Sequence, residues 1–141
     1  MRDRVFSNRY ERQLDDKGRL ALPAKIRSSL GEQVYLARGR SRCVNIVPVA
    51  VFEAEATRML ERVERGELDI NILRAVVSSA TLVSVDKQGR VSVEEHLRDY
   101  AGLTPGSAVM VTGMVNRLEI WPRDRYADAD VQQSSTYGDD T

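Results

Sequence analysis

Two stretches of this 141-residue sequence repeat each other, which limits the folds open to the chain. Residues 14–22 align with residues 85–93, so that an Asp, a Gly, an Arg and three apolar positions coincide at one offset. At the same offset Arg27 falls on Arg98, and after three extra residues in the second copy, shared Gly, Pro and apolar positions continue to residue 126. Shared positions of these types indicate a common backbone. The sequence therefore predicts two copies of one supersecondary unit, each too small to bury a core alone.

Local signals predict the same order of elements in both copies. In the first copy we expect strands over residues 10–14 and 19–22, a helix over residues 24–30, and strands over residues 34–37 and 43–47. In the second copy we expect strands over residues 81–85 and 91–93, a helix over residues 94–101, and strands over residues 108–112 and 117–121. The Asp-Asp-Lys-Gly segment after the first strand is typical of a hairpin turn, because Gly18 permits a positive φ and Asp15 can hydrogen-bond its neighbours' backbone.

The segment between the copies has the apolar spacing of two helices. Apolar residues from Phe52 to Val63 keep helical spacing, Gly66 ends that helix, and a second helix covers residues 72–77. We interpret these apolar stripes as packing surface, either on the domain that the two repeats form or against a neighbouring subunit. After residue 126 the chain is polar and acidic, which predicts a disordered tail. The chain thus divides into four segments: a first repeat at residues 5–52, a helical linker at residues 53–79, a second repeat at residues 80–126 and a disordered acidic tail at residues 127–141.

Composition favours one compact domain, with 42% apolar and 30% charged residues. The net charge is zero, but the first 50 residues hold eleven Lys or Arg against five acids, and the remaining 91 hold ten against sixteen. This asymmetry allows a basic face that meets phosphates. On charge alone, a well-mixed solvated surface is an equally good interpretation.

Neither a membrane-spanning apolar run nor a signal peptide is found, which predicts a cytoplasmic protein.

Residue types needed for catalysis or metal binding do not cluster in the sequence. Cys43 is the only cysteine, which excludes an intrachain disulfide, and one His with one Cys argues against a zinc site. Glu11 and the two acids of the first turn lie among arginines without a nucleophile or base nearby. His96 fits a helix surface, and neither common Gly-rich phosphate loop is present. We therefore predict that the protein is not an enzyme and uses no metal and no cofactor.

Three motifs carry a resemblance to a known family. Asp-Asp-Lys-Gly-Arg at residues 15–19, Leu-Pro-Ala-Lys-Ile-Arg at residues 22–27 and Asp-Lys-Gln-Gly-Arg at residues 86–90 resemble the MraZ family of bacterial transcription regulators, over residues 5–126. The resemblance implies a mixed α+β fold in which two tandem AbrB-like halves form a pseudo-twofold swapped-hairpin β-barrel with short helices and a helical linker. It also implies a homo-oligomer, assembled as a ring. Finally, it implies a nucleoid-associated, sequence-specific regulator that binds repeated boxes in double-stranded DNA upstream of the operon for division and cell-wall synthesis.

This function gives roles to named residues. The predicted DNA-binding residues are Lys17, Arg19, Lys25, Arg27, Lys87, Gln88 and Arg90, and those predicted to orient the turns are Asp15, Gly18, Asp86 and Gly89. Arg19 and Arg90 recur at the same place in both turns, and a guanidinium held by the Asp four residues earlier keeps donors for a phosphate or for guanine O6 and N7. The Asp–Arg pair can also simply close the turn, and the two roles are compatible. Lys17 suits a phosphate contact, and Gln88 suits adenine. The two basic residues on the helix behind the first turn fit a solvated face nearly as well as a phosphate contact.

A protein-interaction module is the alternative function. An antitoxin-like partner with an AbrB fold would have a single half and a long partner-binding tail. Here the repeat is complete, and the tail of about fourteen residues lacks apolar anchors. A DNA-binding regulator is therefore the expected function.

Overall fold

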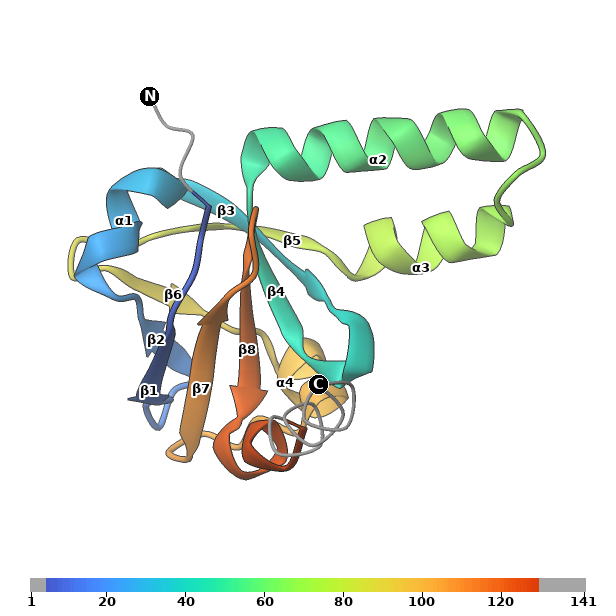
Figure 1. Cartoon of the computed structure of the whole chain (residues 1–141). Coiled ribbons are helices and arrows are strands. Elements are labelled where there is room, and N and C mark those ends of the chain that lie inside the picture. The colour runs from blue at the N-terminus through green and yellow to red at the C-terminus, as the bar shows by residue number, and fades with distance from the viewer. Residues whose placement is uncertain (1–4, 130–141) are drawn as a thin grey trace, which may run out of the picture.

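The computed structural model describes residues 5–129 of the chain (Figure 1). The first copy contains β1 (Arg9–Gln13), β2 (Arg19–Ala21), α1 (Ala24–Leu30), β3 (Gln33–Arg38), the 3-10 turn η1 (Arg40–Arg42) and β4 (Val44–Pro48). A pair of helices follows, α2 (Val49–Glu64) and α3 (Ile70–Ser79). The second copy contains β5 (Thr81–Ser84), β6 (Arg90–Ser92), α4 (Glu95–Ala101), β7 (Ala108–Gly113) and β8 (Leu118–Pro122), and residues 123–129 are helical. The predicted mixed α+β class is confirmed.

Helix ends follow the local signals in the sequence. Helix α1 covers the predicted residues, beginning after Pro23, whose φ of −57° suits a helix start, and ending before Gly31, whose φ is +91°. The Asp69 side chain accepts a 2.8 Å hydrogen bond from the Asn71 N–H and so caps α3. Helix α2 begins directly after Pro48, three residues before the apolar stripe from which it was predicted.

The strands pair mainly between copies. A six-stranded sheet has the order β1-β7-β8-β4-β3-β5, and β2 pairs with β6 in a separate two-stranded ribbon. Within residues 5–129 all strand pairs are antiparallel, and only β3–β4 and β7–β8 join strands of the same copy. Exchanging the two copies leaves this strand order unchanged, so the topology has the symmetry of the repeat.

The predicted hairpin at the first turn is wrong. The Asp15 N–H does donate to the Arg19 carbonyl oxygen at 2.9 Å, but β1 then pairs with β7, and β2 pairs with β6. A local hairpin would give each copy its own small core, whereas exchange of partners lets both copies bury their apolar residues together. The turn therefore connects two sheets rather than two paired strands.

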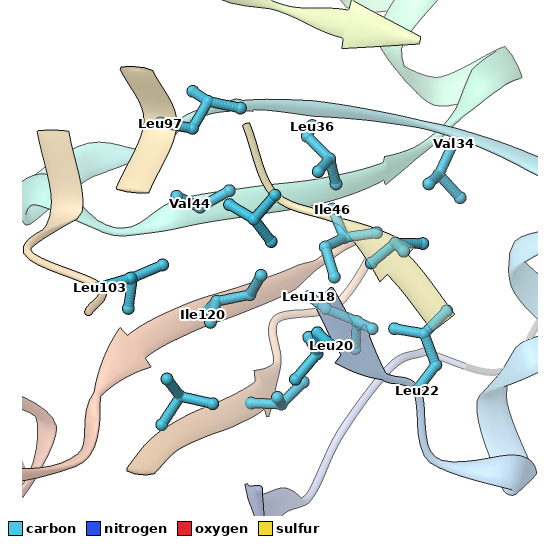
Figure 2. Packing of buried hydrophobic residues seen from close by; sticks show 14 of the residues in the cluster. Leu20, Leu22, Val34, Leu36, Val44, Ile46, Leu97, Leu103, Leu118 and Ile120 are labelled. Atoms are coloured by element: carbon cyan, nitrogen blue, oxygen red, sulfur yellow. The ribbon is translucent and has the colours of Figure 1, made fainter. Parts of the chain in front are cut away.

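One hydrophobic core lies between the two sheets and draws on both copies (Figure 2). Leu20 of β2 pairs with Val91 of β6, and both side chains are buried at 0 and 1% exposure. Leu36 and Ile46 from the first copy and Leu118 from the second are fully buried in the same cluster. Neither copy can keep this core without the other.

A substitution in this shared core tests the interlocked architecture. We expect Leu20→Ala to lower the free energy of unfolding by about 2–5 kcal/mol, because it leaves a cavity where both copies meet. The matched control is Leu82→Ala in β5, where the side chain is 45% exposed and we expect a much smaller loss. Urea unfolding followed by circular dichroism measures both. Equal losses for the two variants would contradict the placement of Leu20.

Helices α2 and α3 pack on each other and extend beyond the sheets (Figure 1). At the base of α2, Phe52 stacks on Tyr35 of β3 with ring centroids 4.2 Å apart, in a second small cluster with Val47. Four apolar side chains farther along are 43–49% exposed: Leu60, Ile70, Ile72 and Val77. The apolar stripe thus packs on the sheet near the start of α2. Farther from the sheet, its side chains are not covered by the other residues that the structure describes. Within residues 5–129, no helix combines the length and apolarity that crossing a bilayer requires.

The chain after β8 begins with a helix. Arg125 donates hydrogen bonds to the carbonyl oxygens of Ser41, Arg42 and Ala101, at 2.6–2.7 Å. Tyr126 packs edge-on against Trp121, with centroids 5.8 Å apart. Residues 127–129, predicted as the start of the disordered tail, are therefore helical, and residues 130–141 lie outside the described part of the chain.

Candidate nucleic-acid interface

The first turn, residues 15–19, is shaped by the Asp15 carboxylate. Its Oδ1 atom accepts hydrogen bonds from the backbone N–H groups of Lys17 and Arg19, at 3.0 and 2.7 Å. The Gly18 N–H donates to the Asp15 carbonyl oxygen at 3.0 Å, and the φ of Gly18 is +78°, a value that favours glycine. The aspartate thus supplies acceptors to the backbone of the turn and fixes its conformation.

The second turn, residues 86–90, repeats this geometry. The Oδ1 atom of Asp86 accepts from the N–H groups of Gln88 and Arg90, at 2.9 and 2.8 Å. The Gly89 N–H donates to the Asp86 carbonyl oxygen at 2.9 Å, and the φ of Gly89 is +79°. The Asp and Gly positions predicted to orient the turns therefore make the same bonds in both copies.

Each turn aspartate also holds the arginine that closes the turn. The Nε atom of Arg19 lies 2.7 Å from Oδ2 of Asp15, and Nε of Arg90 lies 2.9 Å from Oδ2 of Asp86. The two arginine side chains are 30 and 28% exposed. Within the described residues, the Nη groups of both arginines make no hydrogen bond. Each guanidinium is therefore oriented through one edge and keeps outer donors for a phosphate or a base edge.

Hydrogen bonding lowers the pKa of both turn aspartates. The largest cause for Asp15 is the backbone N–H of Arg19, and for Asp86 it is the backbone N–H of Arg90. A carboxyl group with a lowered pKa in the folded state stabilises that state above its ordinary pKa, and the contribution is lost as pH falls through the lowered value. Both turns therefore keep their aspartate hydrogen bonds at neutral and mildly acidic pH.

The two turn arginines lie on one face of the β2–β6 ribbon. Arg19 pairs with Ser92 and Ala21 pairs with Arg90, whereas the intervening Leu20 and its partner point into the core. Side chains alternate between faces along a strand, so Arg19 and Arg90 share the outer face as diagonal neighbours. Diagonal neighbours have Cα atoms about 7–8 Å apart. The structure thus brings together two arginines that are far apart in the sequence.

The tips of the turns carry the other predicted contacts. Lys17, Lys87 and Gln88 are all exposed there. The tips differ in sequence, because Asp16 of the first turn corresponds to Lys87 of the second. Lys25 is exposed in the first turn of α1, where no hydrogen bond to another described residue holds its side chain.

A second pair of arginines contacts the turns from the opposite copy. Arg27 of α1 lies against Gly89, and Arg98 of α4 lies against Gly18, so closely that a Cβ atom at either glycine would overlap the guanidinium. Arg98 also donates from Nη1 to the Val93 carbonyl oxygen at 2.5 Å. Sequence reasoning named Arg27 as a DNA contact and missed Arg98. The alignment of the two repeats places Arg98 at the same position as Arg27. This correspondence is the sequence signal that could have identified Arg98.

The residues considered for catalysis or metal binding are not assembled into a site. Cys43 is fully buried, and burial is the main cause that raises the pKa of its thiol to about 12, which keeps it protonated. His96 contacts Glu94 at 3.0 Å on the exposed side of α4. Residues 5–129 contain no group of three or more His, Cys, Asp or Glu positioned to hold a metal ion.

Comparison with known proteins identifies the family. The family described as "MraZ protein, putative antitoxin-like" matches the chain twice, at residues 5–64 and 76–137. A protein named transcriptional regulator MraZ from Bifidobacterium longum (strain NCC 2705) is 41% identical over 92% of this chain and 85% of its own length. Proteins of the same name from Corynebacterium jeikeium (strain K411) and Finegoldia magna (strain ATCC 29328) are 36 and 32% identical, each over 96% of this chain and 93% of its own length.

Similarity to a solved structure is weaker. The solution structure of PHS018 from Pyrococcus horikoshii superposes with a TM-score of 0.37 at 14% identity, over 79% of this chain and 91% of that chain. The double family match confirms the tandem repeat, and a family of transcriptional regulators agrees with the prediction that the protein is not an enzyme. With the family matched twice and relatives similar over nearly the whole length, the chain belongs to the MraZ family.

Proposed function

We propose that this protein is a sequence-specific DNA-binding transcriptional regulator that binds repeated boxes upstream of the division and cell-wall operon. One observation carries the proposal: two equivalent turns present Asp-held arginines, Arg19 and Arg90, on one face of the β2–β6 ribbon. A pair of oriented guanidinium groups on one exposed surface suits recognition of base edges in the major groove. The names of the relatives, transcriptional regulator MraZ, support the same function.

In this proposal the residues of the turns divide the work of recognition. Arg19 and Arg90 donate to guanine O6 and N7, and the turn aspartates hold them at the angle this requires. Gln88 reads adenine. Lys17 and Lys87 at the tips contact phosphates and set the register on the duplex, and Lys25 adds a phosphate contact from α1.

The proposed architecture is a swapped-hairpin barrel assembled into a ring. The symmetric strand order and the single core between the two sheets support the barrel. A single subunit offers too few recognition groups for the affinity of about 10⁻⁸ M typical of regulators, so several subunits must bind together. The exposed apolar side chains of α2 and α3 suit a subunit interface, since a closed ring would bury them. We place the protein in the cytoplasm, associated with the nucleoid.

Salt dependence tests whether DNA is the partner. If several Lys and Arg neutralise phosphates, log affinity falls linearly with log salt, with a slope of about −0.9 per phosphate contact. We expect a steep negative slope in fluorescence anisotropy titrations with DNA from upstream of the gene. Lys17→Ala should reduce the slope by about one and weaken binding to operator and scrambled DNA alike. A flat salt response of the wild-type protein would contradict the proposal.

An antitoxin-like interaction with another protein is the second candidate. The family description contains this term, and the apolar stripe on α2 and α3 is exposed in a single chain. Exposed apolar surface of this kind suits a protein partner as well as a second copy of the chain. The salt titration separates the two functions, because only phosphate contact releases condensed counterions from DNA.

A further inference from the structure

We infer that Arg27 and Arg98 are positioning residues, each of which holds the DNA-reading turn of the opposite copy, an inference that rests on the proposed function. Arg98 of the second copy lies against Gly18 of the first turn, and Arg27 of the first copy lies against Gly89 of the second turn. We call this arrangement the crossed clasp. It gives Arg27 a role different from the phosphate contact expected from the sequence, and it gives Arg98 a role for the first time.

The first support for the crossed clasp is close packing at the turn glycines. A side chain at Gly18 would overlap the guanidinium of Arg98, and one at Gly89 would overlap that of Arg27. Both glycines also have a positive φ, which favours glycine over other residues. Each position therefore requires glycine for its backbone conformation and because the arginine leaves no room for a side chain. Each arginine side chain therefore covers the backbone of a turn in the other copy.

The second support is a set of backbone hydrogen bonds between the copies. The Val93 N–H donates to the Gly18 carbonyl oxygen, and the Leu22 N–H donates to the Gly89 carbonyl oxygen, both at 2.9 Å. Arg98 donates to the carbonyl oxygen of the same Val93, at 2.5 Å. The backbone N–H of Val93 thus bonds to the first turn, and the backbone carbonyl oxygen of Val93 bonds to Arg98. Val93 therefore connects Arg98 to the first turn.

The crossed clasp lies next to the two arginines that are proposed to contact DNA bases. Gly18 directly precedes Arg19, and Gly89 directly precedes Arg90, so a shift of either glycine moves the arginine proposed to contact a base. A bidentate contact tolerates little displacement, and the groups that support such contacts need to be fixed by packing and hydrogen bonds. The guanidinium of each arginine lies close beside the turn glycine. A lysine ammonium is a compact point charge and lacks the broad planar group of arginine, so it does not reproduce this contact.

Lysine substitution separates positioning from phosphate contact. If Arg98 contacted a phosphate, Arg98→Lys would keep most of the affinity, and Arg98→Ala would reduce the salt slope by about 0.9. If Arg98 positions the first turn, we expect both variants to bind the operator about tenfold more weakly, with the salt slope and the affinity for a scrambled duplex unchanged. Arg65→Lys at the exposed end of α2 is the matched control, and we expect it to bind like the wild type.

The crossed geometry gives a sharper test through double-mutant cycles. Arg98→Lys should add little to the loss caused by Arg19→Ala, because both act on the first turn, and should add fully to the loss caused by Arg90→Ala. Arg27→Lys should show the reverse pattern and provides a second, independent cycle. Additivity of Arg98→Lys with Arg19→Ala, or non-additivity with Arg90→Ala, would overturn the crossed clasp.

Hydrogen exchange on the free protein tests the clasp without DNA. Arg98→Lys should speed exchange of the Val93 amide, which bonds to Gly18, while the Leu22 amide in the opposite turn contact keeps its wild-type rate. Unchanged exchange at Val93 would overturn the inference even if DNA binding is weakened. If instead the wild-type protein binds no operator while the exchange result holds, the proposed function fails and the structural clasp stands.

Discussion

Replacing Arg19 by alanine is expected to abolish the preference of the protein for its operator over a scrambled duplex. Each lost bidentate contact with guanine costs about 1–3 kcal/mol of discrimination, and the loss is multiplied over the subunits that bind one operator together. The fold should remain, because the Arg19 side chain is partly exposed and its ion pair with Asp15 lies at the surface. Anisotropy competition with the two duplexes measures the preference, and circular dichroism checks the fold.

Two further variants separate base reading from simple attraction. Arg19→Lys keeps the positive charge but loses the fork that matches guanine, so we expect it to lose discrimination nearly as fully as alanine. Lys17→Ala removes a charge from the tip of the same turn and should leave discrimination unchanged. A correctly folded Arg19→Ala protein with unchanged operator preference would reject the assignment of Arg19 to base reading.

Moving one operator box by half a turn of DNA should reduce affinity sharply, even with every box intact. A closed ring of like subunits presents its turns at fixed spacing, so the boxes must lie on one side of the duplex, about 10 base pairs apart. An insertion of about 5 base pairs places one box on the opposite side, and an insertion of about 10 restores the alignment. Affinities for the three duplexes by anisotropy measure the effect. Tight binding to one isolated box by a protein that sediments as a monomer would contradict this prediction.

The sequence predicted the local elements well because their signals are local. Pro23 and Gly31 mark the ends of α1, and the apolar stripe beginning at Phe52 marks α2. The pairing of the strands was not predictable in this way. The segment after β1 has the composition of a hairpin turn, yet β1 and β2 pair with strands of the other copy. The deciding energy is burial of one core shared by both copies, which no short window of sequence contains.

In the candidate site, too, contacts within one turn were predictable from the sequence, whereas contacts between the two copies were not. The bonds of Asp15 and Asp86 follow from residue types within each turn, and the structure contains them. The shared face of Arg19 and Arg90 depends on the register of the β2–β6 ladder, which joins residues about seventy positions apart. Arg98 was missed because its contact with Gly18 crosses between the copies. The helix after β8 was missed because Arg125 ties it to residues distant in sequence.

Footprinting on the DNA upstream of its own gene tests the central claim, sequence-specific binding through the turn arginines, most directly. The experiment compares the wild-type protein with the Arg19→Ala/Arg90→Ala double variant at equal concentration. We predict that the wild-type protein protects a set of similar short boxes spaced about one helical turn apart, and that the double variant protects none of them. No protection by the wild-type protein, or the same boxes protected by the folded double variant, would contradict the account.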